Sequence, residues 1–111
     1  MQPGGHLAAG EAPFDAALRE SQEETGLVVK HPPAGPRLIH LDVHEAADSH
    51  VHLDLRYLLL AGDTEPSPGP DESGDVRWCS WEEAFRLCDD ALAGALREAI
   101  GQPEVRQMTE R

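Results

Sequence analysis

The stretch of sequence that decides the fold runs from Gly5 to Leu27 and reads GHLAAGEAPFDAALRESQEETGL. From about Pro13 to Thr25 its pattern is helical, with apolar positions on one side and polar positions on the other. Gly26 follows the last turn, where helices often end on a left-handed glycine. We therefore expect a loop, a helix and a second loop in this order.

Three glutamates of this helix, Glu20, Glu23 and Glu24, have spacings that place them on one helix face. Like charges at these spacings destabilise a helix, and anions near its C-terminal end oppose the helix dipole. A sequence that keeps both unfavourable features indicates a bound cation. Oxygen ligands at this density suit Mg²⁺ or Mn²⁺. The neighbouring Arg19 is placed to pin one carboxylate through a bidentate ion pair.

Taken alone, a Glu-rich helix is usually a solvated surface, so the flanking residues decide between the two interpretations. The spacing Gly-x5-Glu-x7-Arg-Glu-x2-Glu-Glu-x-Gly, from Gly5 to Gly26, resembles the signature of the Nudix hydrolase family. Seven fixed positions match by chance with odds on the order of 10⁻⁸ to 10⁻⁹, given ordinary residue usage. Residues 5–27 are therefore identified as a box of this family, and residues 1–111 as one Nudix-like domain.

The resemblance implies a fold class and a reaction. The fold is α/β, a Nudix-like α/β/α sandwich with a mixed sheet, here lacking the usual N-terminal strands. The reaction is hydrolysis of a nucleoside diphosphate linked to another moiety, with Mg²⁺ or Mn²⁺ as cofactor. The substrate is then a small phosphorylated molecule.

The resemblance also implies roles for individual box residues. Glu23 and Glu24 match the main metal ligands, and Glu20 matches a further ligand or the base that activates water. Arg19 matches the residue that orients a carboxylate. Glu11 and Gly26 match residues that support the loops of the box. The Gly5 carbonyl is a further candidate ligand of the metal.

One box position departs from the family pattern, because Ser21 stands where the family has an aliphatic residue. We expect this serine to weaken the packing of the helix without removing a ligand. Beyond the box, residues 72–78 and 80–84 are similar to the closing strand and last helix of the family. Glu72 and Asp75 are there candidates to assist the metal or the water, and each is equally well read as a solvated loop acid.

Two segments in the middle of the chain alternate between apolar and polar residues, Arg37–Glu45 and Val51–Leu60. They predict a hairpin that turns about Asp48, which would place His44 opposite His52 and His40 opposite Arg56. Its polar residues have three interpretations: part of the substrate groove, a transition-metal site, or solvated strand faces. The residues concerned are His40, Asp42, His44, His52 and Asp54.

The C-terminal part of the chain predicts a short strand at Val76–Cys79, a helix over about 81–100 and a fraying polar tail over 102–111. Cys79 and Cys88 are expected to be reduced thiols in the core. Trp78 and Trp81 are more readily explained by core packing than by stacking on a base.

Charge and composition restrict the possible partners. Nine basic and 21 acidic residues give a formal net charge of −12, which would repel the phosphates of a nucleic acid duplex. No apolar run approaches the ~18 residues of a membrane span, so we expect a cytoplasmic protein without a membrane partner.

Only four residues precede the box. Strands left without neighbours would be open edges, so a homodimer is expected to cover them. The alternative function, from another class, is a catalytically weak Nudix-like domain that binds a nucleotide or a protein. A purely structural acidic interaction module would leave the box unexplained.

Overall fold

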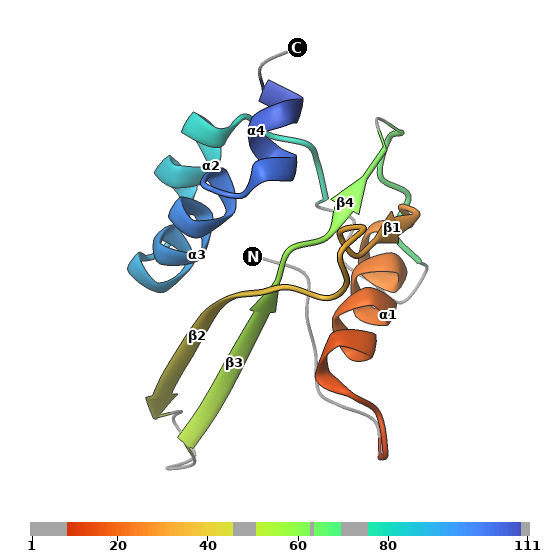
Figure 1. Ribbon diagram of the computed structural model, residues 1–111, viewed down its shortest axis with the longest axis vertical. Coiled ribbons are helices and arrows are strands. Elements are labelled where there is room, and N and C mark those ends of the chain that lie inside the picture. Colours follow the sequence, from red (N-terminus) through yellow and green to blue (C-terminus); the bar gives the residue numbers. More distant parts are fainter. Residues whose placement is uncertain (1–8, 46–50, 63, 70–75, 110–111) are drawn as a thin grey trace.

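In the computed structural model of the chain, which describes residues 9–45, 51–62, 64–69 and 76–109, helices lie on both sides of the strands (Figure 1). Helix α1 contacts strand β3, while α3 contacts β2. This layering makes the fold α/β, as the sequence predicts. The elements in chain order are α1 (Pro13–Thr25), β1 (Val29–Lys30), β2 (Leu38–Glu45), β3 (Val51–Tyr57), β4 (Leu60–Ala61), α2 (Trp81–Leu87), α3 (Asp90–Ile100) and α4 (Pro103–Thr109).

Strands β2 and β3 form the predicted hairpin, and their pairing is antiparallel. His44 lies opposite His52, so the predicted register is confirmed. Strand β3 ends at Tyr57 rather than at the predicted Leu60. Leu60 instead begins β4, which pairs antiparallel with β1. Both strand pairs in the described part of the chain are thus antiparallel.

Helix α1 begins at Pro13, whose fixed backbone angle suits the first helical position, and ends at Gly26. Gly26 adopts the left-handed conformation with φ 70°, and its N–H donates to Gln22 O at 2.8 Å. A loop from far along the chain covers this helix end, because the N–H of Ser67 donates to Thr25 O at 2.7 Å. A Cβ added at Gly26 would collide with the carbonyl oxygen of Ser67. The glycine is therefore required both for the backbone angle and for the close approach of this loop.

The inner face of α1 buries Ala16, Ser21 and Thr25. Ser21 is 9% exposed, so it occupies an inward-facing position, as expected for the place of an aliphatic side chain. Thr25 Oγ1 donates to Ser21 O at 2.6 Å and accepts from the N–H of Leu27 at 3.1 Å. These bonds fix the last turn of the helix, and the weaker packing expected at Ser21 stays a prediction.

The prediction of one helix over 81–100 is wrong, because α2 ends at Leu87 and α3 begins at Asp90. Cys88 has an extended backbone, and Asp89 caps α3 by accepting from the N–H of Leu92 at 2.8 Å. An Asp side chain competes with the helix backbone in this way, so it starts a new helix more readily than it continues one. Ser80 caps α2 by accepting from the N–H of Glu83 at 3.1 Å.

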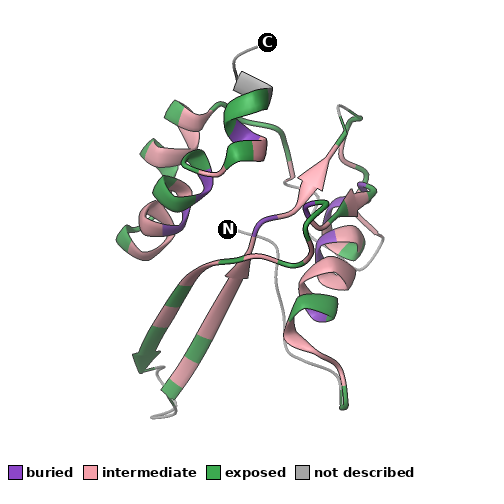
Figure 2. Cartoon of the chain, viewed as in Figure 1, coloured by how far each residue is buried: buried purple, intermediate pink, exposed green. Residues whose placement is uncertain are grey.

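The polar tail also differs from expectation, because residues 103–109 form α4 rather than fraying. Val105 is 6% exposed and joins Leu58 and Ala99 in a buried cluster against which Trp81 packs (Figure 2). The buried Val105 thus anchors α4, and Arg37 holds the start of the same helix through contacts with Gln102 and Glu104.

The expectations for residues 76–79 are likewise corrected: the described residues 76–80 form no strand, and Cys79 is exposed. Cys88 is half-buried rather than a core thiol. Trp78 is 49% exposed, and its indole N–H donates to Thr64 O at 2.7 Å on the surface. Trp81 is the tryptophan that packs against the core.

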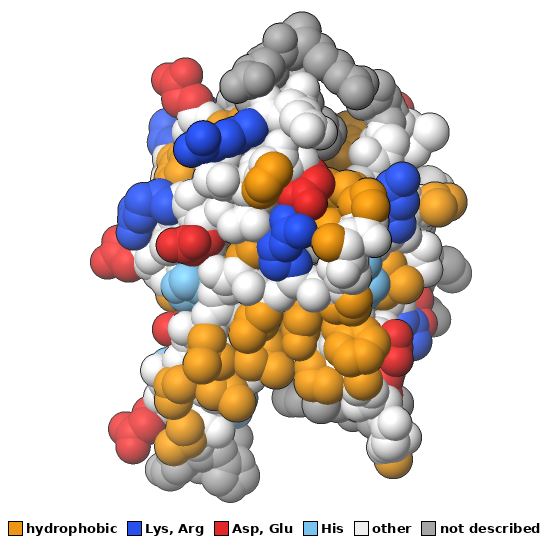
Figure 3. Space-filling model, viewed as in Figure 1, with side chains coloured by type: hydrophobic (Ala, Val, Ile, Leu, Met, Phe, Trp, Pro, Cys, Tyr) orange, Lys and Arg blue, Asp and Glu red, His pale blue; other side chains and the backbone are white. Residues whose placement is uncertain are grey.

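One face of the β2–β3 hairpin is apolar and open to solvent. Leu41, Val43, Val51 and Leu53 are each more than half exposed. Hydrophobic side chains gather across the lower half of the view in Figure 3, where the hairpin lies. The polar side chains of the hairpin point to its other face, because neighbours along a strand alternate.

Candidate active site

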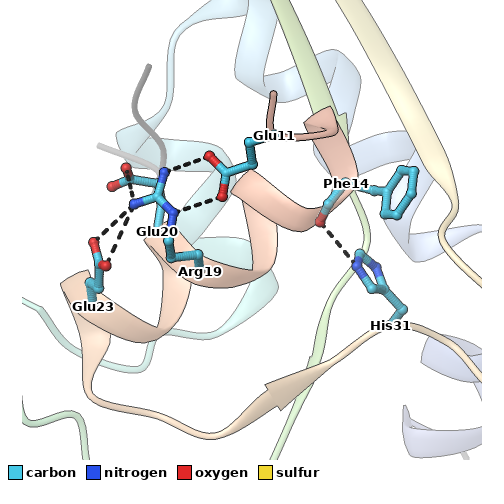
Figure 4. A network of polar contacts seen from close by, with 6 residues as sticks. All are labelled: Glu11, Phe14, Arg19, Glu20, Glu23 and His31. Atoms are coloured by element: carbon cyan, nitrogen blue, oxygen red, sulfur yellow. Dashed lines mark hydrogen bonds and ion pairs between the residues drawn. The ribbon is translucent and has the colours of Figure 1, made fainter. Parts of the chain in front are cut away.

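Arg19 is the centre of an ion-pair network that joins the loop before α1 to the helix itself (Figure 4). Its Nε donates to Glu11 Oε2 at 2.8 Å, and its Nη2 donates to Glu11 Oε1 at 2.9 Å. Its Nη1 donates to Glu20 Oε1 at 2.8 Å and to Glu23 Oε2 at 3.3 Å. One guanidinium therefore gathers three of the box carboxylates.

The burial of these groups makes the network more than a surface ion pair. The side chains of Glu11 and Glu20 are 14% and 18% exposed, whereas that of Glu23 is 51% exposed. Hydrogen bonds to Glu11 and then to Glu20 raise the pKa of Arg19 above its ordinary value, so the guanidinium stays charged. A charged, forked donor between partly buried carboxylates fixes their orientation.

The acidic residues of α1 have the donor chemistry that a hard divalent cation requires. Glu20, Glu23 and Glu24 supply carboxylate oxygens from one helix, and Arg19 contacts Glu20 through Oε1 only. A carboxylate has two oxygens, so Glu20 can serve Arg19 and a cation together. The residues present therefore fit Mg²⁺ or Mn²⁺.

Three of the candidate site residues lie outside the described residues, namely Gly5, Glu72 and Asp75. Their proposed roles stay predictions.

His31 is a residue that sequence reasoning missed. Its Nε2 lies 3.1 Å from Phe14 O (Figure 4). Its ring makes edge contacts with Phe14 and Tyr57. It thereby ties the segment after β1 to the first turn of α1. A histidine between a strand and a proline-rich loop carries no pattern that would have revealed this contact.

The polar residues of the hairpin occupy one face of β2 and β3, as the alternation predicts. Asp42, His44 and Asp54 come together, with ligand atoms all within 4.8 Å of one another. His40 is held elsewhere, with its Nδ1 3.1 Å from Arg56 Nη1 and its ring against Gly94.

Comparison with known proteins agrees with the box and the fold. Residues 2–99 match the sequence pattern of the NUDIX domain, which covers most of the chain. The chain therefore belongs to the NUDIX family.

Two similar proteins are hydrolases by name. The chain is 39% identical over 63 residues to a probable DHNTP pyrophosphohydrolase of Lactococcus lactis, a match covering 53% of this chain and 38% of that protein. It is 28% identical over 98 residues to an asymmetrical bis(5'-nucleosyl)-tetraphosphatase of Caenorhabditis elegans, covering 85% of this chain and 67% of that protein. The chain thus spans about two fifths of the first relative and two thirds of the second.

A solved structure, that of a NUDIX-family hydrolase from Clostridium perfringens, has a similar fold. The TM-score is 0.67 at 25% identity, over 86% of this chain and 76% of that one. Among the described residues, no helix is both long and apolar enough to cross a membrane.

Proposed function

We propose that this chain is a divalent-metal-dependent hydrolase that cleaves the diphosphate linkage of a nucleoside diphosphate joined to another moiety. The observation that carries the proposal is the bridge from Arg19 to Glu11, Glu20 and Glu23, which orients carboxylates along the helix that holds the box. The names of the two relatives support a phosphorylated nucleotide-like substrate, because both are hydrolases of phosphate anhydrides.

The roles of the residues follow from their places on α1. Glu23 and Glu24 would hold Mg²⁺ or Mn²⁺, with the Gly5 carbonyl as a further candidate ligand. Glu20, fixed by Arg19 at 2.8 Å, would serve as a ligand or as the base that takes a proton from the attacking water. Glu11 and Gly26 would keep the two ends of the helix in place.

When bound, a divalent ion neutralises phosphate oxygens and lowers the pKa of a coordinated water. The chain supplies the rest: Arg19 holds the carboxylates in position, and the half-buried Glu20 lies where its environment is partly shielded from bulk water. The positive charge of the bound cation matters because the chain is strongly acidic. With a formal net charge of −12, the chain alone would repel a polyphosphate.

The proposed assembly is a homodimer. Two features support it: the exposed apolar side chains of Leu41, Val43 and Leu53, and the pairing of β2 with β3 alone among the described strands. An isolated two-stranded sheet is only marginally stable, so a second copy that covers the apolar face would stabilise it.

The decisive test is the double variant Glu23→Gln, Glu24→Gln, which removes two ligands at nearly constant volume. We expect it to abolish Mg²⁺-dependent release of phosphate or pyrophosphate from a panel of nucleoside triphosphates and dinucleoside polyphosphates. The matched control is Glu45→Gln, Glu98→Gln, which neutralises two exposed glutamates elsewhere. Unchanged turnover in the box variant would rule out the assignment. Nucleotide binding without turnover in the unmodified chain would favour the catalytically weak binding domain.

A thermal scan gives a second readout that does not depend on activity. Mg²⁺ should stabilise the folded chain by about 2.7 kcal/mol at a hundredfold excess over its Kd. Na⁺ at matched ionic strength should do much less, because screening is not coordination. Equal shifts from both salts would mean that the acidic helix is only a solvated surface.

A further inference from the structure

The polar face of the β2–β3 hairpin carries three cross-strand pairs in a row. They are His40 with Arg56, Asp42 with Asp54, and His44 with His52. Opposite residues of an antiparallel pair lie on the same face, so these six side chains form one ladder. None of them belongs to the box, and the ladder therefore needs its own explanation.

The central pair of this ladder is electrostatically unfavourable, because the carboxylates of Asp42 and Asp54 stand directly opposite each other. Like charges in this arrangement destabilise strand pairing. His44 lies between them, with Nδ1 3.1 Å from Asp42 Oδ2 and 3.8 Å from Asp54 Oδ2. In the described part of the chain, these three residues form the one group of at least three potential metal ligands whose ligand atoms lie within 4.8 Å of one another.

The distances from His44 Nδ1 to the two carboxylate oxygens suit a small divalent ion. Zinc bound tetrahedrally with bonds of about 2.0–2.1 Å has ligand atoms about 3.3 Å apart. The two distances from His44 Nδ1, 3.1 and 3.8 Å, lie on either side of that value. The side chains of Asp42, His44 and Asp54 are 28%, 45% and 40% exposed, so an ion can enter and keep a water ligand.

The neighbours of the cluster add a fourth candidate ligand and a partial counter-charge. The rings of His44 and His52 have centroids 5.5 Å apart, which places a second imidazole beside the first. Arg56 Nη2 lies 3.9 Å from Asp54 Oδ2, beyond hydrogen-bond distance, and Arg56 Nη1 contacts His40. Two carboxylates and one guanidinium leave a net negative charge for an incoming cation.

We propose that Asp42, His44 and Asp54 form a second metal site, which binds a divalent transition-metal ion of the Zn²⁺ class. Imidazole with carboxylate suits Zn²⁺, Co²⁺ or Ni²⁺, whereas Mg²⁺ prefers oxygen ligands alone. The ion would neutralise the facing carboxylates and bridge β2 to β3 near the hairpin tip. The site is independent of the box and of the hydrolase proposal.

The test is a calorimetric titration of the full chain, without an affinity tag, with Zn²⁺ in excess Mg²⁺ that saturates the box. We expect one Zn²⁺ per chain. His44→Gln and Asp54→Asn should each weaken binding by more than about tenfold, since even outer partners of metal ligands contribute 10–100-fold. The matched control is Glu45→Gln, which removes a negative charge from the same strand on its opposite face. Co²⁺ gives a second readout, because its visible spectrum should show nitrogen and oxygen ligands only when His44 is present.

Each remaining outcome would overturn the proposal. Equal Zn²⁺ affinity in the unmodified chain and in His44→Gln would exclude this cluster. Loss of Zn²⁺ binding in Glu23→Gln, Glu24→Gln, with retention in Asp54→Asn, would assign the ion to the box. A higher KM for a hydrolysed nucleotide in His44→Gln, without any Zn²⁺ binding, would make the ladder part of the substrate groove. Circular dichroism verifies folding, which these exposed positions should not disturb.

Discussion

Arg19 and Glu11 form a bidentate ion pair between residues eight positions apart, with N–O distances of 2.8 and 2.9 Å. The same guanidinium reaches Glu20, so the loop before α1 and a box carboxylate share one support. The orientation of Glu20 is therefore linked to the position of the preceding loop.

The first prediction concerns this support. In Arg19→Lys the charge remains, but an ammonium cannot make the forked contact with Glu11 and also reach Glu20. We expect Mg²⁺ affinity to fall by about 10–100-fold, as for other residues that orient metal ligands, with partial recovery of activity at high Mg²⁺. The measurement is the Mg²⁺ dependence of turnover. Arg77→Lys, at an arginine paired with Glu83 on α2, is the control. An unchanged Mg²⁺ dependence would show that Arg19 does not position ligands.

The second prediction concerns Gly26. Gly26→Ala should destabilise the chain for two reasons, the left-handed backbone and the collision with the Ser67 carbonyl. Gly10→Ala is the matched control, because Gly10 also has a positive φ, 77°, but nothing within 4 Å of an added Cβ. We expect backbone strain to lower the free energy of unfolding by about 1–2 kcal/mol in both variants. Gly26→Ala alone should lose more. Urea unfolding measures both, and equal losses would contradict the close approach of the loop.

The third prediction concerns pH. Arg37 Nη1 lies 2.5 Å from Glu104 Oε2, and this hydrogen bond lowers the pKa of Glu104 below its ordinary value of 4.5. A folded-state pKa below the unfolded value means that the pair contributes stability above about pH 4.5, which is lost as pH falls through the folded pKa. Between pH 6 and pH 3 the unmodified chain should therefore lose more unfolding free energy than Glu104→Gln. Glu98→Gln should behave like the unmodified chain; parallel curves for all three would contradict the prediction.

The fourth prediction concerns assembly. Leu53 is 59% exposed on the apolar face of the hairpin, so Leu53→Lys should leave the fold of one chain intact. If a second copy covers this face, the substitution should convert a dimer into a monomer at micromolar concentration, as measured by light scattering. Leu87→Lys, at a 64% exposed leucine on α2, should leave the dimer unchanged. A stable monomer of the unmodified chain would exclude the homodimer.

The hairpin was predictable because the alternation of apolar and polar residues in its two strands is regular. A shift of one residue would reverse every side chain, so the pattern excludes such a shift, and His44 does face His52. The bounds of α1 were predictable for a similar local reason, since the C-terminal Gly26 marks the helix end. Both elements could be predicted because the residues that determine each of them lie within one short segment.

The predictions failed where a local signal competed with tertiary structure. The apolar spacing continues through Cys88 and Asp89, but the Asp89 cap breaks the helix there. Helix α4 was missed because its anchors are tertiary, namely the burial of Val105 and the ion pair of Glu104 with Arg37. At the site, Arg19 was expected to pin one carboxylate, whereas it contacts three. The reach of an arginine to a loop residue depends on the path of that loop, which spacing alone does not define.

The loop that covers the end of α1 has a consequence for the order of folding. Ser67 and Gly69 donate to the carbonyls of Thr25 and Glu23, yet β1, β2, β3 and β4 lie between them in sequence. Closing so long a segment costs conformational entropy before these bonds can form, which makes such contacts slow to appear. The turns of α1 can form from local bonds, whereas the two bonds from the loop need the whole intervening segment to close first. We therefore expect the cover over the helix end that carries Glu23 to form late in folding.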